Sequence, residues 1–387
     1  MDSIYEEVVG FYRGWHKLEM SGIYSDGHEI VDQDWSPLSR CDSFSSRREV
    51  LGALNGLRRN LDEHHDADQM VRDNLRASET YLRATLGERF AIRDYVASLY
   101  LYDPAPIPER TLRATAAEVR ELCSRFGLRY SPEDRAAYFA RFRVESAQEV
   151  AELARAGQDY WLERLYRHIE PPQELKIEVQ IVRKDEPWSF FLSTEAGIAT
   201  FSINAHPRHI FTRGQCQYIT SHEVAGHAVQ NSCWARAVIR DELPAALHIH
   251  ATHHPTAALK EGIAQALPYF LCERSELDPE MMLAKKLREL RDMTLANAQL
   301  MLEGGGSVTA AWDYCASRLS FVEPFEIERD IANRALKPAE RAYQHCYAPS
   351  FLAFLRVAER LGQGEVGDFL RSHYHRIPSV SEFWRRA

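Results

Sequence analysis

The sequence lacks the cysteine pattern of a disulfide-stabilised or zinc-ribbon protein. Its seven cysteines are odd in number and scattered, and no two of them form a C-x-x-C pair, which argues against both a disulfide framework and a structural zinc cluster. They are Cys41, Cys123, Cys216, Cys233, Cys272, Cys315 and Cys346. We therefore expect reduced thiols.

Basic residues are outnumbered by acidic ones, and long apolar runs are lacking. The chain has 47 Lys and Arg against 56 Asp and Glu, and its net charge of −9 with interspersed signs argues against a nucleic-acid partner. No apolar run approaches membrane-spanning length, and Met1–Glu7 has neither the basic nor the apolar region of a signal peptide. We expect a soluble, cytoplasmic protein without membrane contact that binds a small molecule or a peptide.

Helical periodicity dominates the N-terminal part, residues 1–173. Apolar residues recur there at three-and-four spacing, which is typical of amphipathic helices. The predicted helices are Ile4–Leu18, Ser46–His65, Asp68–Leu86, Pro108–Phe126 and Ser146–His168. No linker separates this part from residues 174–387, so we expect one predominantly helical domain over residues 1–387.

Three short segments near residue 200 have a different character. Glu178–Val182, Ser189–Leu192 and Ala199–Ile203 are rich in β-branched and aromatic residues, which favours strands. They predict a small antiparallel sheet, and the helical pattern returns after about residue 214. The expected fold class is therefore mainly α, of the α+β type, with an edge strand that could bind an extended substrate.

One motif follows this sheet. His222 and Glu223 are followed by His227, so the motif is H-E-x-x-x-H, one residue longer than the zinc signature H-E-x-x-H. In a regular helix, residues five apart point about 140° away from each other. A π-type turn near Ala225-Gly226 would return both imidazoles to one face, because the wider turn adds one residue. The alternative is that both histidines are ordinary hydrogen-bonded residues of a regular helix.

A catalytic zinc site needs a third protein ligand. Glu261 is the best candidate, because it lies in an apolar helical segment where an unpaired carboxylate is costly. The alternative is that Glu261 caps its helix or pairs with Lys260.

Four further histidines lie between the motif and Glu261. They could hold a second metal or donate to a transition state, or they could belong to a polar loop. They are His248, His250, His253 and His254.

The motifs together resemble the bacterial domain-of-unknown-function family 885, which is similar to the zincin peptidases. The resemblance rests on Ala199–Asn204, Ser221–Gln230, Glu261-Gly262, Phe325–Arg329 and the segment from Lys337 to Tyr343. The matching segments follow one another in the family's order over about residues 175–380. The family's pattern is approximately H-E-x-x-P-G-H-x-x-Q followed by E-G-W-A, and this chain departs from it in the histidine spacing, the missing proline and the replaced tryptophan.

The resemblance implies a largely helical zincin-like fold with a bound divalent metal, zinc or else iron or another metal. It implies that Glu223 is the general base and that the metal ligands are His222, His227 and Glu261. It also implies that Arg329 and Tyr343 line the cleft and contact a substrate carboxylate or the developing oxyanion. Tyr347 competes with Tyr343 for this role, because the spacing of the segment differs by one residue.

The predicted function is metal-dependent hydrolysis of a peptide or amide bond in a small substrate. Two alternatives stay open at this point. One is a metalloenzyme that carries out a tailoring or oxidative reaction, or a small-molecule binder on the same scaffold. The other is a helical scaffold protein without metal.

Overall fold

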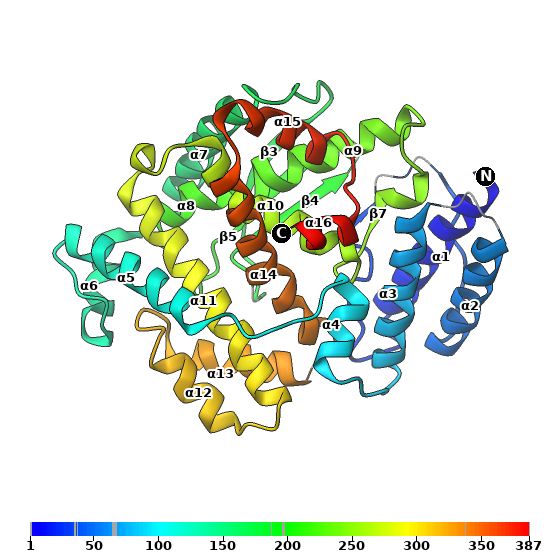
Figure 1. Ribbon diagram of the computed structural model, residues 1–387, viewed down its shortest axis with the longest axis horizontal. Helices are drawn as coiled ribbons and strands as arrows, with labels where there is room; N and C mark the ends of the chain where they lie inside the picture. Colours follow the sequence, from blue (N-terminus) through cyan, green and yellow to red (C-terminus); the bar gives the residue numbers. More distant parts are fainter. Residues whose placement is uncertain are drawn as a thin grey trace.

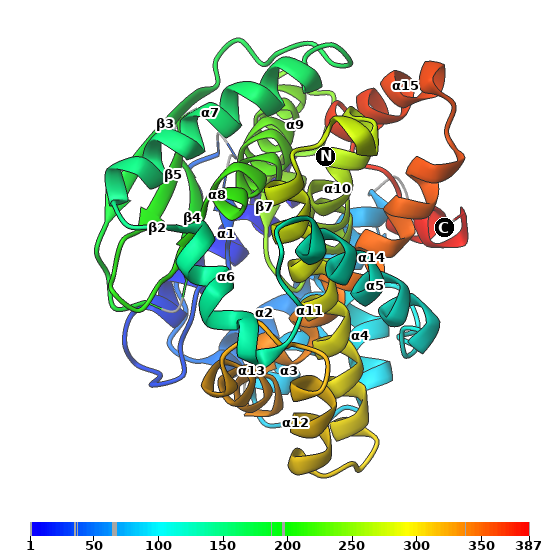
Figure 2. The ribbon, with the colours of Figure 1, turned by 90° about the vertical axis from the view of Figure 1, so that its left-hand side faces the viewer.

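The computed structural model describes residues 2–34, 36, 38–63, 68–186, 188–195, 198–336 and 338–386. Helices form most of the molecule, and a small sheet lies at one side of it (Figure 1, Figure 2). The mainly helical α+β class predicted from the sequence is confirmed.

The predicted helices of the N-terminal part are present with small differences at their ends. The second of them ends at Glu63, and His65 lies outside the described residues. One short helix, α4, was not predicted. The helices of this part are α1 (Asp2–Met20), α2 (Arg47–Glu63), α3 (Gln69–Thr85), α4 (Ile92–Tyr100), α5 (Glu109–Arg125), α6 (Arg135–Phe142) and α7 (Ala147–Leu165).

The first four helices share a hydrophobic core with residues from far along the chain. Trp15 and Tyr95 are fully buried in the same cluster as Trp234, Leu247 and Cys346. The N-terminal part is therefore packed directly onto the part that carries the motif, and the two parts do not have separate cores.

The small sheet consists of β3 (Lys176–Val182), β4 (Phe190–Glu195) and β5 (Ile198–Asn204) in the order β3-β5-β4. β4 and β5 are antiparallel as predicted, but β3 runs parallel to β5, so the sheet is mixed and the prediction of a purely antiparallel sheet was wrong. Helix α7 covers one face of the sheet through Val150 and Ala154. Alternation along a strand predicts which face is buried, but it does not give the direction of the neighbouring strand.

The motif segment lies next to a central helix, α10 (Pro255–Leu271). Two glycines allow close packing on both sides of α10. A Cβ atom at Gly226 would lie 2.6 Å from Cβ of Ala264, and a Cβ atom at Gly262 would lie 2.7 Å from Cβ of Ser350 on α14. The backbone of α10 is thus held between the motif segment and α14. The neighbouring helices are α8 (Arg213–Thr220), α9 (Val229–Ile239), α11 (Pro279–Glu303) and α14 (Pro338–Arg360).

The remaining elements are short or peripheral. The helices are α12 (Val308–Ala316), α13 (Pro324–Leu336), α15 (Gln363–Tyr374), α16 (Val380–Arg386) and the 3-10 turns η1 (Pro132–Asp134), η3 (Ala245–His248) and η4 (Arg274–Glu276). Two antiparallel strand pairs complete the fold: β1 (Gln33–Asp34) with β7 (Ile249–His250), and β2 (Arg143–Val144) with β6 (Phe211–Thr212).

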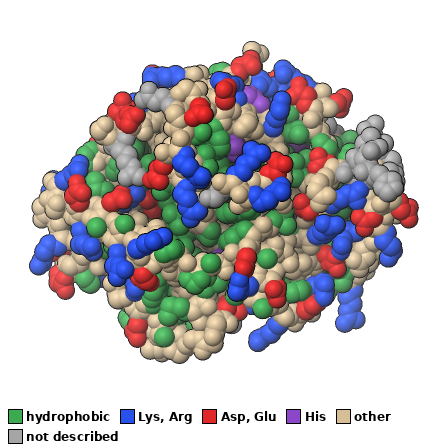
Figure 3. Space-filling view, viewed as in Figure 1, with side chains coloured by type: hydrophobic (Ala, Val, Ile, Leu, Met, Phe, Trp, Pro, Cys, Tyr) green, Lys and Arg blue, Asp and Glu red, His purple; other side chains and the backbone are tan. Residues whose placement is uncertain are grey.

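The surface and the cysteines agree with an ordinary globular composition. Acidic and basic side chains are interspersed over the face shown in Figure 3. Among the described residues, no helix is both long and apolar enough to cross a membrane. The seven cysteines are free.

Candidate metal centre

The two motif histidines lie on a π-helical segment, η2 (Ser221–Ala228), which joins α8 to α9. Residues five apart share one face of a π-helix. The rings of His222 and His227 accordingly face each other, with centroids 4.6 Å apart and Nε2 atoms 3.2 Å apart. The locally widened helix predicted near Ala225-Gly226 is confirmed.

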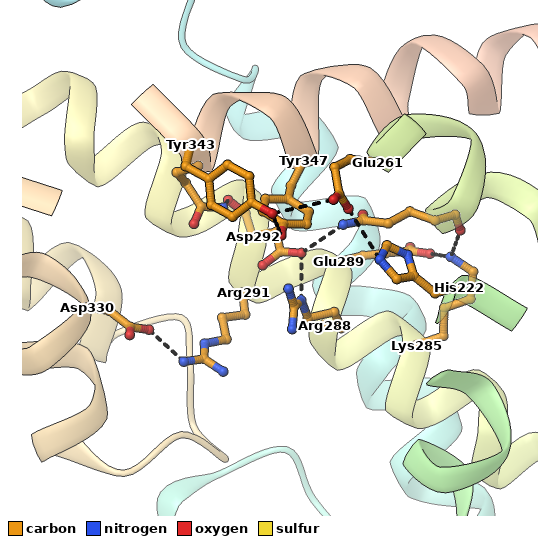
Figure 4. Close-up of polar contacts among 12 residues, drawn as sticks. His222, Glu261, Lys285, Arg288, Glu289, Arg291, Asp292, Asp330, Tyr343 and Tyr347 are labelled. Carbon is orange, nitrogen blue, oxygen red and sulfur yellow. Dashed lines mark hydrogen bonds and ion pairs between the residues drawn. The ribbon is translucent and has the colours of Figure 1, made fainter. Parts of the chain in front are cut away.

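Glu261 joins the two histidines from the first half of α10. Its Oε2 atom lies 3.2 Å from Nε2 of His222 and 3.5 Å from Nε2 of His227 (Figure 4 shows the contact with His222). The three side chains are at most 13% exposed. These three residues form a group whose ligand atoms could hold one metal ion. The predicted ligand set is therefore brought together by the fold.

The spacing of these atoms fits a tetrahedral cation. Zinc bonds to nitrogen and oxygen of about 2.0–2.1 Å imply ligand atoms about 3.4 Å apart along each edge of a tetrahedron, and the three observed spacings are 3.2, 3.2 and 3.5 Å. The Oε2 atom of Glu261 is buried and has no well-directed hydrogen bond among the described residues. Two ring nitrogens and a carboxylate oxygen thus lie within 3.5 Å of one another, and a bound cation would give all three a common partner.

The charges around Glu261 keep it ionised. Burial would raise the pKa of Glu261, but the two imidazoles beside it hold the pKa well below its usual range. The Nδ1 atoms of His222 and His227 have no hydrogen-bond partner among the described residues. The hydrogen bond that commonly orients a metal-bound imidazole from its far side is thus not formed by protein groups in the described part of the chain.

Glu223 follows the first ligand and is only partly buried. Its pKa is raised to about 7, mainly because burial disfavours the charged form; the charge of Glu261 also raises it, whereas the charges of His222 and Arg288 lower it. The described residues give its carboxylate no hydrogen bond or ion pair. Glu223 therefore combines a position beside the ligands with a carboxylate that is not engaged elsewhere.

Both candidate tyrosines lie at the site, on α14. The Tyr343 hydroxyl donates to Oε1 of Glu261 at 3.4 Å, and the Tyr347 hydroxyl donates to the Tyr343 hydroxyl at 2.7 Å (Figure 4). Burial raises the pKa of both phenols well above its usual value, so both are neutral donors. The two tyrosines form a chain that leads to the third ligand, with Tyr343 as the nearer member.

Arg329 does not join this cluster through any described contact. It lies on α13, its side chain is 38% exposed, and its ion pairs are to Asp330 at 3.5 Å and to Glu326 at 3.9 Å. A role for Arg329 in binding a substrate carboxylate stays a prediction from the family resemblance.

The four histidines of residues 248–254 are buried and mostly bonded to distant parts of the chain. Nε2 of His248 lies 2.8 Å from the Trp234 carbonyl oxygen. Nε2 of His253 lies 2.9 Å from Oγ of Ser78, and Nε2 of His254 lies 3.0 Å from the Tyr12 hydroxyl. No second metal-ligand group is found among the described residues.

His250 is the histidine of this tract that lies beside the candidate metal centre. It lines a cavity of about 20 Å³ beside Glu261 and Tyr343, which also includes Asp32 and Lys260. Such a volume accommodates roughly one water molecule. The histidine tract therefore mainly fixes the N-terminal helices, and one histidine faces the site.

Asp32 and Lys260 were not predicted as site residues. The Asp32 amide donates to the His250 carbonyl oxygen at 2.8 Å, next to the β1–β7 pairing, and the Lys260 ammonium donates to Oε1 of Gln33 at 3.2 Å. Asp32 is exposed to solvent and lines the same small cavity as Lys260 and Glu261. Only tertiary structure could have revealed Asp32, which lies far from the motif in sequence.

The edge strand is where the sequence predicted it. β4 is at one edge of the sheet and contacts both η2 and β1. Its Thr194 hydroxyl is buried and has no hydrogen-bond partner among the described residues. The strand is therefore in a position to add an extended ligand along the cleft.

Comparison with known proteins gives a fold and no family. No family model matches the chain, and no curated protein matches it. A solved structure from Colwellia psychrerythraea, of a protein described as a candidate lipoprotein, is similar with a TM-score of 0.64 and 16% identity. The similarity covers 88% of this chain and 69% of that one. At this identity the likeness shows the fold alone, so the resemblance to family 885 stays a prediction.

Proposed function

We propose that this chain is a metal-dependent hydrolase of a peptide or amide bond in a small substrate, with zinc as its metal. The observation that carries the proposal is the convergence of three buried ligand atoms, from His222, His227 and Glu261, at spacings that fit one tetrahedral ion. A structural zinc site would have four protein ligands, and three leave a position open for chemistry. A cytoplasmic location stays a prediction from the sequence.

The residues divide the reaction between them. Bound zinc supplies Lewis-acid polarisation of the scissile carbonyl and of an attacking water. Glu223 accepts the proton of that water as the C–O bond forms, and then delivers it to the leaving nitrogen as the C–N bond breaks. Tyr343 donates from its neutral hydroxyl to the developing oxyanion, and Tyr347 holds that hydroxyl in place.

The test combines metal analysis with a matched carboxylate variant. We expect one equivalent of zinc in the purified protein, lost in a His222→Ala, His227→Ala double variant. Glu223→Gln should keep the metal and lose activity on a panel of dipeptides and acyl amino acids by roughly 10²- to 10⁴-fold, the usual contribution of a general base.

Three outcomes would contradict the proposal. Hydrolysis that survives Glu223→Gln, with contaminating peptidases excluded, refutes the mechanism. Stoichiometric iron with oxygen consumption would favour an oxidative metalloenzyme instead. A protein without stoichiometric metal whose unfolding is insensitive to chelators would be a scaffold.

A further inference from the structure

Arg288 is exposed in a segment of α11 that is otherwise buried. The side chains of Lys285 and Glu289 on either side are 1% and 3% exposed, whereas that of Arg288 is 43% exposed. The helix lies inside the molecule, against α5, α8 and α14. The long charged side chain of Arg288 is thus open to water beside charged residues that are buried.

The exposed guanidinium lies close to the residues of the candidate metal centre. The guanidinium carbon of Arg288 lies 5.6 Å from the ring centroid of Tyr347, within the range of a cation–π contact. The Tyr347 hydroxyl donates a hydrogen bond to the Tyr343 hydroxyl, which donates one to Glu261. The charge of Arg288 also acts on Glu223. Arg288 therefore lies near both a tyrosine of the cluster and the candidate general base.

The guanidinium is fixed in place at one end. Its Nε donates to Oδ2 of Asp292 at 2.8 Å, and the Asp292 side chain is 6% exposed (Figure 4). Asp292 is itself held by Gln265, whose Nε2 lies 3.5 Å from the same oxygen, and by Gln344, which donates to the Asp292 carbonyl oxygen at 3.1 Å. The described contacts use only Nε, so both terminal nitrogens keep their N–H groups available.

An oriented guanidinium with two free nitrogens is suited to a carboxylate. Its planar fork matches the two oxygens of a carboxylate in a bidentate contact. By contrast Arg291, on the same helix, is already occupied by an ion pair with Asp330 at 2.6 Å. The two arginines thus form a matched pair, one held through Nε with both terminal nitrogens open and one held through a terminal nitrogen.

We propose that Arg288 binds a free carboxylate of the substrate, so that the substrates are short peptides or acyl amino acids with an unblocked carboxyl end. The inference rests on the proposed function. Because Glu223 delivers its proton to the leaving nitrogen and Arg288 lies on the Glu223 side, the carboxylate belongs to the leaving amino acid. Arg288 is then a specificity-determining residue, and β4, which contacts η2, would align the acyl part.

The first test compares an acid with its amide. We expect wild-type protein to hydrolyse N-acetyl-Ala-Phe with a kcat/KM roughly 10- to 100-fold above that for N-acetyl-Ala-Phe-amide, as a hydrogen-bonded charge allows. Arg288→Gln should lower the value for the acid to that for the amide, and Arg288→Lys should retain part of the preference. Arg291→Gln is the matched control and should keep the preference.

The second test does not depend on hydrolysis. Calorimetric titration of metal-free protein with 3-phenylpropanoate should show binding that is weakened roughly 10- to 100-fold in Arg288→Gln and unchanged in Arg291→Gln. The uncharged 3-phenylpropanamide should bind weakly to all of these proteins. Thermal unfolding curves of the variants show whether each is folded.

The outcomes separate this inference from the proposed function. Wild-type protein that hydrolyses nothing but binds 3-phenylpropanoate through Arg288 contradicts the proposed function and supports the carboxylate site. Hydrolysis without an acid preference, or a preference that is lost in Arg329→Gln and kept in Arg288→Gln, overturns the carboxylate site. Equal binding of 3-phenylpropanoate by wild type and Arg288→Gln also overturns it.

Discussion

Replacement of Gly226 by alanine tests whether the π-helix and α10 set the metal geometry together. The new Cβ atom would lie 2.6 Å from Cβ of Ala264 and 3.0 Å from its Cα atom, whereas ordinary contact begins at 3.4 Å. The two helices must therefore separate by about 0.8 Å, the gap between 2.6 and 3.4 Å. Ala264 lies about one turn beyond Glu261, so this displacement reaches a metal ligand.

The expected effect on metal binding is larger than the effect on stability. Overpacking costs about 1–3 kcal/mol, and the higher helix propensity of alanine offsets about 1 kcal/mol of that. Metal–ligand distances tolerate only about ±0.2 Å. A shift several times larger in Glu261 should weaken metal affinity by roughly 10- to 100-fold, the range found when ligand orientation is disturbed.

The assay is competition for zinc with a chromophoric chelator, combined with urea unfolding of the metal-free protein. Gly52→Ala on α2 is the matched control, because a Cβ atom there meets nothing within 4 Å, and it should leave metal affinity unchanged. The double variant Gly226→Ala, Ala264→Gly moves the methyl group to the opposite helix and should recover most of the affinity. Wild-type affinity in Gly226→Ala, or a double variant that recovers none, would refute the reasoning.

Three further predictions concern the neighbours of the ligands. Tyr343→Phe should lower kcat by roughly 10²- to 10³-fold with metal content unchanged, as loss of an oxyanion donor does, whereas Tyr347→Phe should have the smaller effect in the same assay. Glu289→Gln should lower the free energy of urea unfolding by about 3–5 kcal/mol, because Lys285 stays buried without its 2.5 Å partner. Burial would raise the pKa of Glu289, but Lys285 and its neighbouring lysine hold it at about 2. Since this lies below the value near 4.5 expected when unfolded, the stabilisation is complete above that pH, and the difference between wild type and variant should shrink as pH falls from about 4.5 towards 2; a constant difference would contradict the assignment. Removing the metal with a chelator should lower the thermal midpoint of unfolding. Free zinc at about 1,000 times its Kd should then restore about 4 kcal/mol of the free energy of unfolding, and it should restore none in a variant in which Glu261 is replaced.

The helices of the N-terminal part could be predicted because their signal is local. An amphipathic stripe of 17 or more residues, as in α2 and α3, leaves a repeating pattern that needs no knowledge of the partner. α4 is only nine residues long, too short for such a pattern. The parallel pairing of β3 with β5 was missed for another reason, because strand direction depends on the chain between the strands and not on the residues within them.

The proximity of the two candidate ligand histidines could be predicted for the same reason as the helices. His222 and His227 are five residues apart, and the chemistry of the pair requires a particular local backbone, which the structure has. Asp32 and Arg288 carry no such signal, since each becomes a cleft residue only through contacts made far away in the chain. The histidine tract was ambiguous because its main partners, Tyr12 and Ser78, lie on helices of the N-terminal part.

The order of these residues along the chain has a consequence for biosynthesis. All three ligands lie between residues 222 and 261, on η2 and α10, whereas the tyrosines that stand over them arrive only with α14. As the ribosome releases the chain, the complete ligand set emerges while the helix that narrows the cleft is still untranslated. A metal ion captured at that stage would serve as a nucleus around which the last helices assemble, and zinc supply during synthesis would then limit the yield of native protein more than zinc added afterwards.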